Sequence, residues 1–347
     1  MNFSCAIFNP PYQETRGGTK NVDVWPAFID EATKIAEVAC VIHPGRWLIP
    51  KKQMQSVHNK IINSGLKSFD YYPDASDIFH GVAIDGGITI TVFDGKYSGD
   101  IEYYCNGKFM GPYNDDIFFS NAYEEEAYTK IHDAIKTNKT MKDRILGNIG
   151  SLGGREFGYS KHTQLSQLSD NPATMKHPIK VWANTSFGKG GKFSWHFIEK
   201  DDLIEVPAEL FATRKVMIDK KGHAITHGSN NVINNIPQVV ECEATASGDV
   251  LFILPEDDTE YDLKLIKSLF MTKTARFLMS ITQKSLYVMG FENIPDYTMF
   301  IPMLNGDLFT DSFFYKTFGF SKELIEHIET HVSAKKEPNA GGICNGN

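Results

Sequence analysis

Residues 9–12, Asn-Pro-Pro-Tyr, are the part of this sequence whose residue types and order are suited to chemistry. An amide oxygen and a nearby backbone carbonyl can each accept a hydrogen bond from an aromatic amine, and two such bonds aim its lone pair at an electrophile. Asn9 offers the amide oxygen, and Pro10 offers a carbonyl on a backbone whose φ is fixed. Pro11 fixes the turn, and Tyr12 adds a flat face for a flipped-out base. The alternative is that the tetrapeptide only ends a strand.

The elements on either side of this loop predict a parallel α/β sheet. Residues 3–8 are a short apolar run that stops at two prolines, as a buried strand does before a loop. Residues 24–39 have apolar side chains at helical spacing, and residues 39–42 form a second apolar strand. In such a sheet, ligands bind at the carboxyl ends of strands. The loops 9–12 and 43–47 both follow such ends.

Further along the chain the patterns predict a helix over 54–63 and an antiparallel hairpin that closes on Asp94-Gly95. A helix follows over 124–135, with an acidic first turn. A single clear helix is expected over 263–278, within a mainly β region.

Several segments resemble, in the same order, the adenine-N6 DNA methyltransferases of the gamma order in type IIG and type III restriction-modification systems. FNPPYQ (8–13) matches the family's catalytic loop, and VIHPGRWL (41–48) is similar to a strand and loop of the family. Residues 78–99 look like its hairpin region. Residues 263–287 resemble the helix that closes the target-recognition domain, and residues 300–329 resemble the family's last segment.

This resemblance implies the fold class and the activity. The expected fold is α/β: a partial Rossmann-like methyltransferase sheet, then a mainly β target-recognition domain and a small C-terminal helical element. The expected divisions are the rear half of the catalytic domain (1–150), the target-recognition-like domain (151–305), the helical element (306–334) and a disordered tail (335–347). The implied reaction is methyl transfer from S-adenosylmethionine to a flipped adenine in DNA, in a restriction-modification context. Asn9 and Pro10 would orient the amine, Pro11 would hold the turn, and Tyr12 would stack on the base.

The resemblance also predicts that the S-adenosylmethionine site is incomplete in this chain. In this order the half that binds the cofactor, with its glycine loop, precedes the Asn-Pro-Pro-Tyr loop, and only eight residues precede Asn9 here. The nearest downstream glycine loop, residues 188–191, is not followed by a helix pattern. We therefore expect a second polypeptide that supplies the cofactor half, or a homo-oligomer. The alternatives are a non-catalytic methylase derivative that binds DNA or protein in anti-restriction or regulation, and a truncated remnant of a methyltransferase.

Four further residues are candidates for the target-base pocket. Arg46 and Trp47 follow a strand end, where they could line the pocket or contact a phosphate; otherwise Arg46 is a surface charge and Trp47 is core. Phe93 and Tyr97 flank the Asp94-Gly95 turn, and the resemblance implies that an aromatic side chain of this region stacks on the base. Strand aromatics also serve as core.

Double-stranded DNA is the expected partner. Residues 176–221 carry nine basic and six acidic side chains, with aromatic residues between them, which suits phosphate and stacking contacts as well as an ordinary charged face. The residues expected to contact DNA are Lys180, Lys189, Lys192, Trp195, Lys273 and Arg276.

Composition limits which other functional classes and cellular locations are expected. The chain is 347 residues long with a net charge of −8, which counts mildly against a nucleic-acid binder. The five cysteines are scattered, which predicts a reducing compartment, and no apolar run reaches the length of a membrane span. We expect a cytoplasmic protein with no membrane contact. The histidines lack the spacing and companions of a metal site, so no metal is expected.

Overall fold

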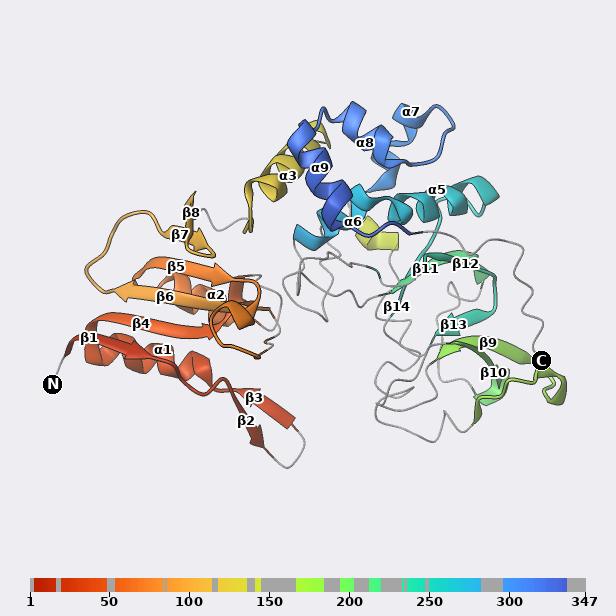
Figure 1. Cartoon of the computed structure of the whole chain (residues 1–347). Coiled ribbons are helices and arrows are strands. Elements are labelled where there is room, and N and C mark those ends of the chain that lie inside the picture. Colours follow the sequence, from red (N-terminus) through yellow and green to blue (C-terminus); the bar gives the residue numbers. More distant parts are fainter. Residues whose placement is uncertain are drawn as a thin grey trace.

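The computed structural model describes residues 3–16, 20–48, 54–82, 84, 86–113, 118–135, 141–144, 167–183, 194–202, 212–219, 233, 236–246, 250–281 and 296–335 (Figure 1). These residues form a mixed α/β structure with one large sheet, smaller sheets and helices, which confirms the predicted fold class.

The largest sheet has six strands in the order β1-β4-β6-β5-β7-β8. Its strands are β1 (Phe3–Phe8), β4 (Ala36–Pro44), β5 (Leu66–Tyr72), β6 (Ile88–Asp94), β7 (Glu102–Cys105) and β8 (Lys108–Pro112). β1 and β4 are parallel, with Phe8 opposite Val41, as the strand-helix-strand pattern predicts. A small hairpin, β2 (Gln13–Arg16) with β3 (Lys20–Asp23), lies between β1 and the first helix.

The prediction of a β-hairpin that closes on Asp94-Gly95 is wrong. β6 does end at Asp94, but it lies antiparallel between β4 and β5, and the next strand, β7, pairs in parallel with β5. The tight hairpin of this region joins β7 to β8 through Asn106 and Gly107, whose φ angles are 50° and 75°. An Asn-Gly pair with two positive φ angles is what a two-residue hairpin of the right twist requires.

Helices α1 (Trp25–Ile35) and α2 (Gln55–Ile62) cover one face of the six-stranded sheet. Trp25, Ile29 and Ala32 of α1 and Ile61 of α2 are buried with the inward side chains of β4, β5 and β6. The chain leaves α1 at Ala36, so the helix predicted over 24–39 is shorter and the strand begins earlier. A parallel α/β unit hides its apolar strand face in this way.

The rest of the described chain builds a second body around short strands and a helical cluster. One three-stranded sheet contains β10, β9 and β13, and another contains β12, β11 and β14. These strands are β9 (Pro178–Ala183), β10 (Ser194–Glu199), β11 (Lys215–Asp219), β12 (Gln238–Val240), β13 (Ala244–Ala246) and β14 (Val250–Ile253). The helices are α3 (Ala122–Ile135), α5 (Glu260–Met271), α6 (Lys273–Ile281), α7 (Ile301–Leu304), α8 (Asp311–Thr317) and α9 (Lys322–His331).

Two expectations about this second body need correction. The helix predicted over 263–278 is two helices, because the backbone at Thr272 is extended with ψ 145°. Helix α3, assigned above to the catalytic half, has Ala127 and Ile131 in the same core as α5, α6 and α9. The predicted domain boundary at residue 150 therefore does not coincide with the boundary between the two hydrophobic cores. Residues 145–166 and 336–347 lie outside the described part of the chain. The helical element predicted over 306–334 is present as α8 and α9.

Candidate active site

The Asn-Pro-Pro-Tyr loop directly follows β1, at the end of the sheet where the parallel strands β1 and β4 finish. Asn9 is exposed and Pro10 is buried, so the amide is presented to solvent on a fixed backbone. Tyr12 is half-buried against the core beneath α1, and its carbonyl accepts a hydrogen bond from the backbone N–H of Val24 at 3.1 Å. Burial raises the pKa of the Tyr12 phenol, so this ring stays neutral.

Asn9 and Tyr12 already contact each other. The Tyr12 hydroxyl donates a hydrogen bond of 3.1 Å to Oδ1 of Asn9, the atom expected to accept from a substrate amine. An amide oxygen has two acceptor positions, so one remains for a second donor. The loop therefore has the predicted acceptor in an accessible place, with half of its capacity used internally.

Asp23 connects this loop to the loop after β4. Its Oδ1 accepts from Nε2 of Gln13 at 3.1 Å and from Nη2 of Arg46 at 2.9 Å. The side chains of Asp23 and Arg46 are only 20% and 23% exposed. Arg46 was predicted to lie near the base pocket, and the structure places it beside the loop but paired with a carboxylate. Asp23 itself was missed, because its partner lies 23 residues away.

Trp47 and Phe93 do not line an open pocket. Trp47 is fully buried, and its indole N–H donates to Oγ1 of Thr89 at 3.0 Å. Phe93 is 1% exposed and belongs to the same core. The prediction that Trp47 and Phe93 line the target-base pocket is wrong, because their rings fill the space between α1, α2 and the sheet.

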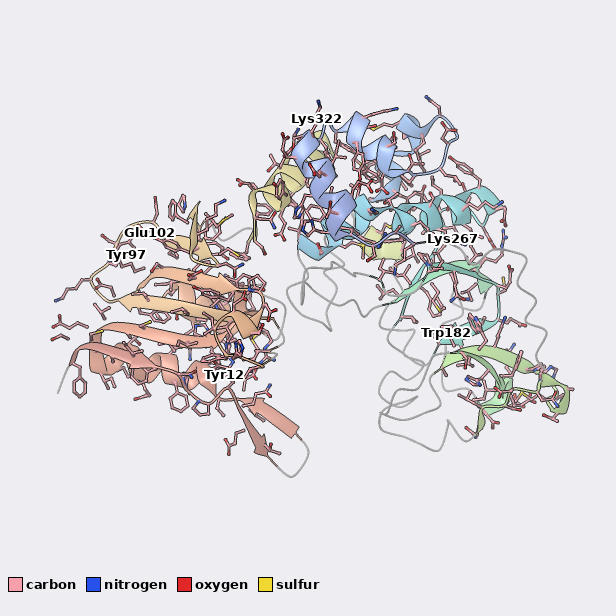
Figure 2. The ribbon with its side chains drawn as sticks, in the orientation of Figure 1. Tyr12, Tyr97, Glu102, Trp182, Lys267 and Lys322 are labelled. Atoms are coloured by element: carbon pink, nitrogen blue, oxygen red, sulfur yellow. The ribbon has the colours of Figure 1, made fainter. Side chains whose placement is uncertain are left out.

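Tyr97 lies at the wrong end of the sheet for the predicted stacking role. β6 runs antiparallel to β4, so the chain after Asp94 emerges where β1 and β4 begin. Figure 2 shows Tyr12 and Tyr97 at opposite ends of the strands. The Tyr97 hydroxyl donates to the carbonyl of Asp100 at 2.7 Å, and the Lys67 ammonium lies 5.6 Å from its ring.

The predicted DNA contacts have mixed outcomes. Lys180 is exposed, and its ammonium lies 4.8 Å from the ring centre of the half-buried Trp195, whose N–H donates to Gln238 at 3.3 Å. Lys189 and Lys192 lie outside the described residues.

The two predicted DNA contacts in α6 are wrong in this structure. Lys273 is 15% exposed and pairs with the Glu329 carboxylate at 2.6 Å. Arg276 is completely buried, and its Nε donates to the carbonyl of Thr272 at 3.1 Å. Burial lowers the pKa of Arg276 to about 10. Lys273 joins the start of α6 to α9, and Arg276 bonds backbone carbonyls at the α5–α6 junction.

A pocket on the second body was not predicted. It lies beside α5 and the start of α8, and Figure 2 shows Lys267 on this helix. Its lining includes Lys264, Lys267, Ser268, Thr310 and Asp311. The basic residues sit on the outer side of a helix whose other side is core, which is an ordinary amphipathic pattern and gave no separate signal.

The described residues do not by themselves fit S-adenosylmethionine. At the end of the sheet they supply the exposed Asn9 loop, and on the far side of β1 the described chain contains no further strand. Within the described ranges, no three His, Cys, Asp or Glu side chains gather as metal ligands. No described helix has the length and apolar character needed to cross a bilayer.

Comparison with known proteins places the chain near one class of structures at low similarity. No protein-family model and no curated protein matches it. The similar solved structures include restriction-modification enzymes and a methyltransferase subunit. The chain spans less than half the length of each of the three described next.

The type IIL restriction-modification enzyme MmeI in complex with DNA shares 12% identity over 84% of this chain and 46% of that chain, with a TM-score of 0.43. The type IIG restriction endonuclease BpuSI shares 10% identity over 90% and 44%, with a TM-score of 0.30. A type I methyltransferase subunit from Streptococcus thermophilus shares 16% identity over 30% and 26%, with a TM-score of 0.25. At these values the similarities carry no argument about what this chain does.

Proposed function

We propose that this chain is the part of an adenine-N6 DNA methyltransferase that orients the target amine, acting in a restriction-modification context. The observation that supports this most directly is the position of Asn9. Asn9 is an exposed residue followed by the buried Pro10, and it lies at the carboxyl end of a parallel strand, where open α/β sheets bind ligands.

The chain's own residues would act on the amine in two ways. Oδ1 of Asn9 and the carbonyl of Pro10 accept its two N–H bonds, which draws the lone pair out of the ring plane. Tyr12 gives up its bond to Asn9 and stacks on the flipped base. Neither acceptor is a base, so the proton that the amine loses on methylation passes to water. S-adenosylmethionine would supply the methyl group.

DNA contact on the second body rests on Lys180, with Lys189 and Lys192 as further members of the same basic segment. Lys180 is exposed beside Trp195, and this arrangement suits a phosphate contact next to an aromatic face. Lys273 and Arg276 are not included, because both are occupied inside the fold.

The test is N6-methyladenine in the DNA of cells that express the chain with its neighbouring reading frames. Asn9→Ala should lower the modification at least about 100-fold, as the loss of a preorganised hydrogen-bonding group does in other active sites. Asn63→Ala, an exposed asparagine after α2, is the matched control and should leave it unchanged. Undiminished methylation in Asn9→Ala would refute the proposal.

A second candidate is a methylase-derived binding protein without catalysis. It is favoured by the internal Tyr12–Asn9 bond, which occupies one acceptor position of the Asn9 amide oxygen. This candidate predicts DNA or protein binding with no N6-methyladenine in any combination of reading frames. A DNA titration at two salt concentrations then distinguishes a DNA-binding protein from a protein-binding one, because binding through phosphate contacts weakens steeply with salt.

A further inference from the structure

Strand β10 carries a serine and a histidine on one face, two residues apart. Because successive side chains of a strand point to opposite faces, Ser194 and His196 share a face of the sheet formed by β10, β9 and β13 (Figure 1). The residues directly opposite them on β9 are Ala183 and Val181, both completely buried. His196 is 8% exposed, while Ser194 is exposed at the start of the strand. The histidine ring is therefore enclosed, and the serine is accessible.

An aspartate is held against the same histidine by a separate segment. Ser169 and Phe197 exchange two backbone hydrogen bonds, each of 2.8 Å, which fix the segment before β9 against β10. Asp170 follows directly, and its Oδ1 lies 2.6 Å from Nδ1 of His196. On the other side of the ring, Nε2 lies 2.8 Å from Oγ of Ser194. The three side chains are therefore joined by two hydrogen bonds, with the imidazole in the middle.

The direction of these two bonds follows from the groups themselves. An ionised carboxylate can only accept, so Nδ1 of His196 carries the proton and donates to Asp170. In a neutral imidazole the other nitrogen, Nε2, then has only its lone pair. The Ser194 hydroxyl must therefore donate to Nε2, and this is the direction in which a histidine can remove the serine proton.

We propose that Ser194, His196 and Asp170 form a second chemical site, in which the Ser194 oxygen is a nucleophile that attacks carboxylic esters. His196 is the general base, and Asp170 is a positioning residue that fixes the tautomer and orientation of the ring. Serine hydrolases on unrelated folds use the same three roles in the same order. This activity goes beyond the proposed methyl transfer, because it uses neither Asn9 nor DNA.

The reaction balances with water as its one co-reactant. As the Ser194 oxygen bonds to the carbonyl carbon of the ester, its proton passes to Nε2 of His196. The bond from that carbon to the ester oxygen then breaks, and the leaving alkoxide takes the proton from His196 and departs as an alcohol. In the second step water attacks the acyl-serine with His196 again as base, which releases the carboxylic acid and restores the Ser194 hydroxyl.

The exposure of the site decides the class of substrate. The Asp170 side chain is 86% exposed, so water screens its charge and its main effect is on the orientation of the ring. A nucleophile and a base at the surface suit an ester, whose alkoxide or phenolate leaves more readily than the amine of an amide.

A purely structural role would not require the serine. The two backbone bonds between Ser169 and Phe197 already fasten the segment to β10, and the bond between Asp170 and His196 adds to them. The bond between Ser194 and His196 contributes nothing to that fastening, because both residues belong to the same strand. It does orient the hydroxyl as an activated nucleophile requires.

The test is labelling of the full chain with a fluorophosphonate probe, which reacts with activated serine oxygens, followed by mass spectrometry of the adduct. The adduct should lie on Ser194 and be absent in Ser194→Ala. Ser98→Ala removes another exposed serine as the matched control, and this variant should be labelled as the wild type is. The activated ester p-nitrophenyl acetate should be hydrolysed above the buffer rate by the wild type and by Ser98→Ala, but not by Ser194→Ala.

The two supporting residues have different expected effects. His196→Gln should lower the labelling rate about 100-fold or more, the usual contribution of a general base. In the wild type the rate should fall at least about tenfold from about pH 8 to about pH 5, because a protonated imidazole cannot accept the serine proton. Asp170→Asn should slow labelling and move the midpoint of this pH profile to lower pH, because the imidazolium loses its neighbouring carboxylate. An unchanged profile would overturn the positioning role of Asp170.

Two other results overturn the proposal as a whole: no adduct on Ser194 in the wild type, or an adduct that forms at the same rate in His196→Gln. Circular dichroism checks that each variant folds. Ser194→Ala and Asp170→Asn change exposed residues, so they decide the outcome even where His196→Gln is unstable. Neither assay contains DNA or S-adenosylmethionine, so the result is independent of the proposed function.

Discussion

Around Asn9, a few polar contacts decide what the candidate site can do. The Tyr12 hydroxyl donates a hydrogen bond to Asn9, and the Asp23 carboxylate accepts hydrogen bonds from Gln13 and Arg46. Side-chain hydrogen bonds therefore hold both loops at this end of the sheet. The sequence showed the tetrapeptide, because its chemistry is local. It did not show Asp23, because a carboxylate between two loops has no local signature.

At the residue scale we predict that Asp23→Asn lowers the free energy of unfolding by about 1 kcal/mol, the upper range for a partly exposed ion pair. The variant removes the charge that faces Arg46 while it keeps the shape of the side chain. Urea unfolding measures the change. Glu31→Gln is the control: its pair with Lys34 is about two-thirds exposed, at 64% and 65%, and should contribute almost nothing. Equal effects of the two variants would argue against a role for Asp23 in joining the loops.

At the scale of elements, the α5–α6 junction differs from the predicted single helix because of a distant residue. Asp311 at the start of α8 accepts the backbone N–H groups of Lys273 and Thr274 at 3.1 and 2.8 Å. Oγ1 of Thr272 accepts the N–H of Ala275 at 3.2 Å, so a new helix begins there. The helical spacing of apolar residues continues through the break between α5 and α6. Periodicity alone therefore predicts a single helix here.

We predict that Asp311→Ala destabilises the protein by roughly 1–3 kcal/mol, because two N–H groups of α6 lose their acceptor. The midpoint of urea unfolding reports the loss. Asp307→Ala, in the exposed turn before α8, should shift that midpoint by far less. If the two variants behave alike, the cap does not stabilise the junction.

At the scale of the whole molecule, the six-stranded sheet has a buried neutral histidine in its core. His43 is completely buried, stacks on Trp25 at 4.6 Å and has its pKa lowered to about 3 by desolvation. Below its ordinary pKa of about 6.5, the unfolded chain binds a proton that the folded chain does not. This histidine therefore makes stability fall as the pH drops from about 6.5 towards 3.

We predict a loss of up to about 1.4 kcal/mol per pH unit from His43 in this window. Urea unfolding of wild type and His43→Gln at pH 7, 6 and 5 measures it, and the variant should show the shallower dependence. His80→Gln, which replaces an exposed histidine, should keep the slope of the wild type. A parallel decline in all three proteins would assign the acid sensitivity to other groups.

The sequence by itself determined the local features: the strand that stops before Pro10, the Asn-Pro-Pro-Tyr loop after it, and the helices near 25–35, 55–62 and 122–135. These depend on spacing, proline and residue type over a few positions. The tertiary structure alone decided the strand order, which separates Tyr97 from Asn9, and the burial of Trp47, Phe93 and Arg276. It also decided that α3 belongs with α9, where Glu126 accepts from the hydroxyl of Ser321 at 2.7 Å. The physical reason is that pairing and burial are set by partners far away in sequence, which no local pattern of side chains specifies.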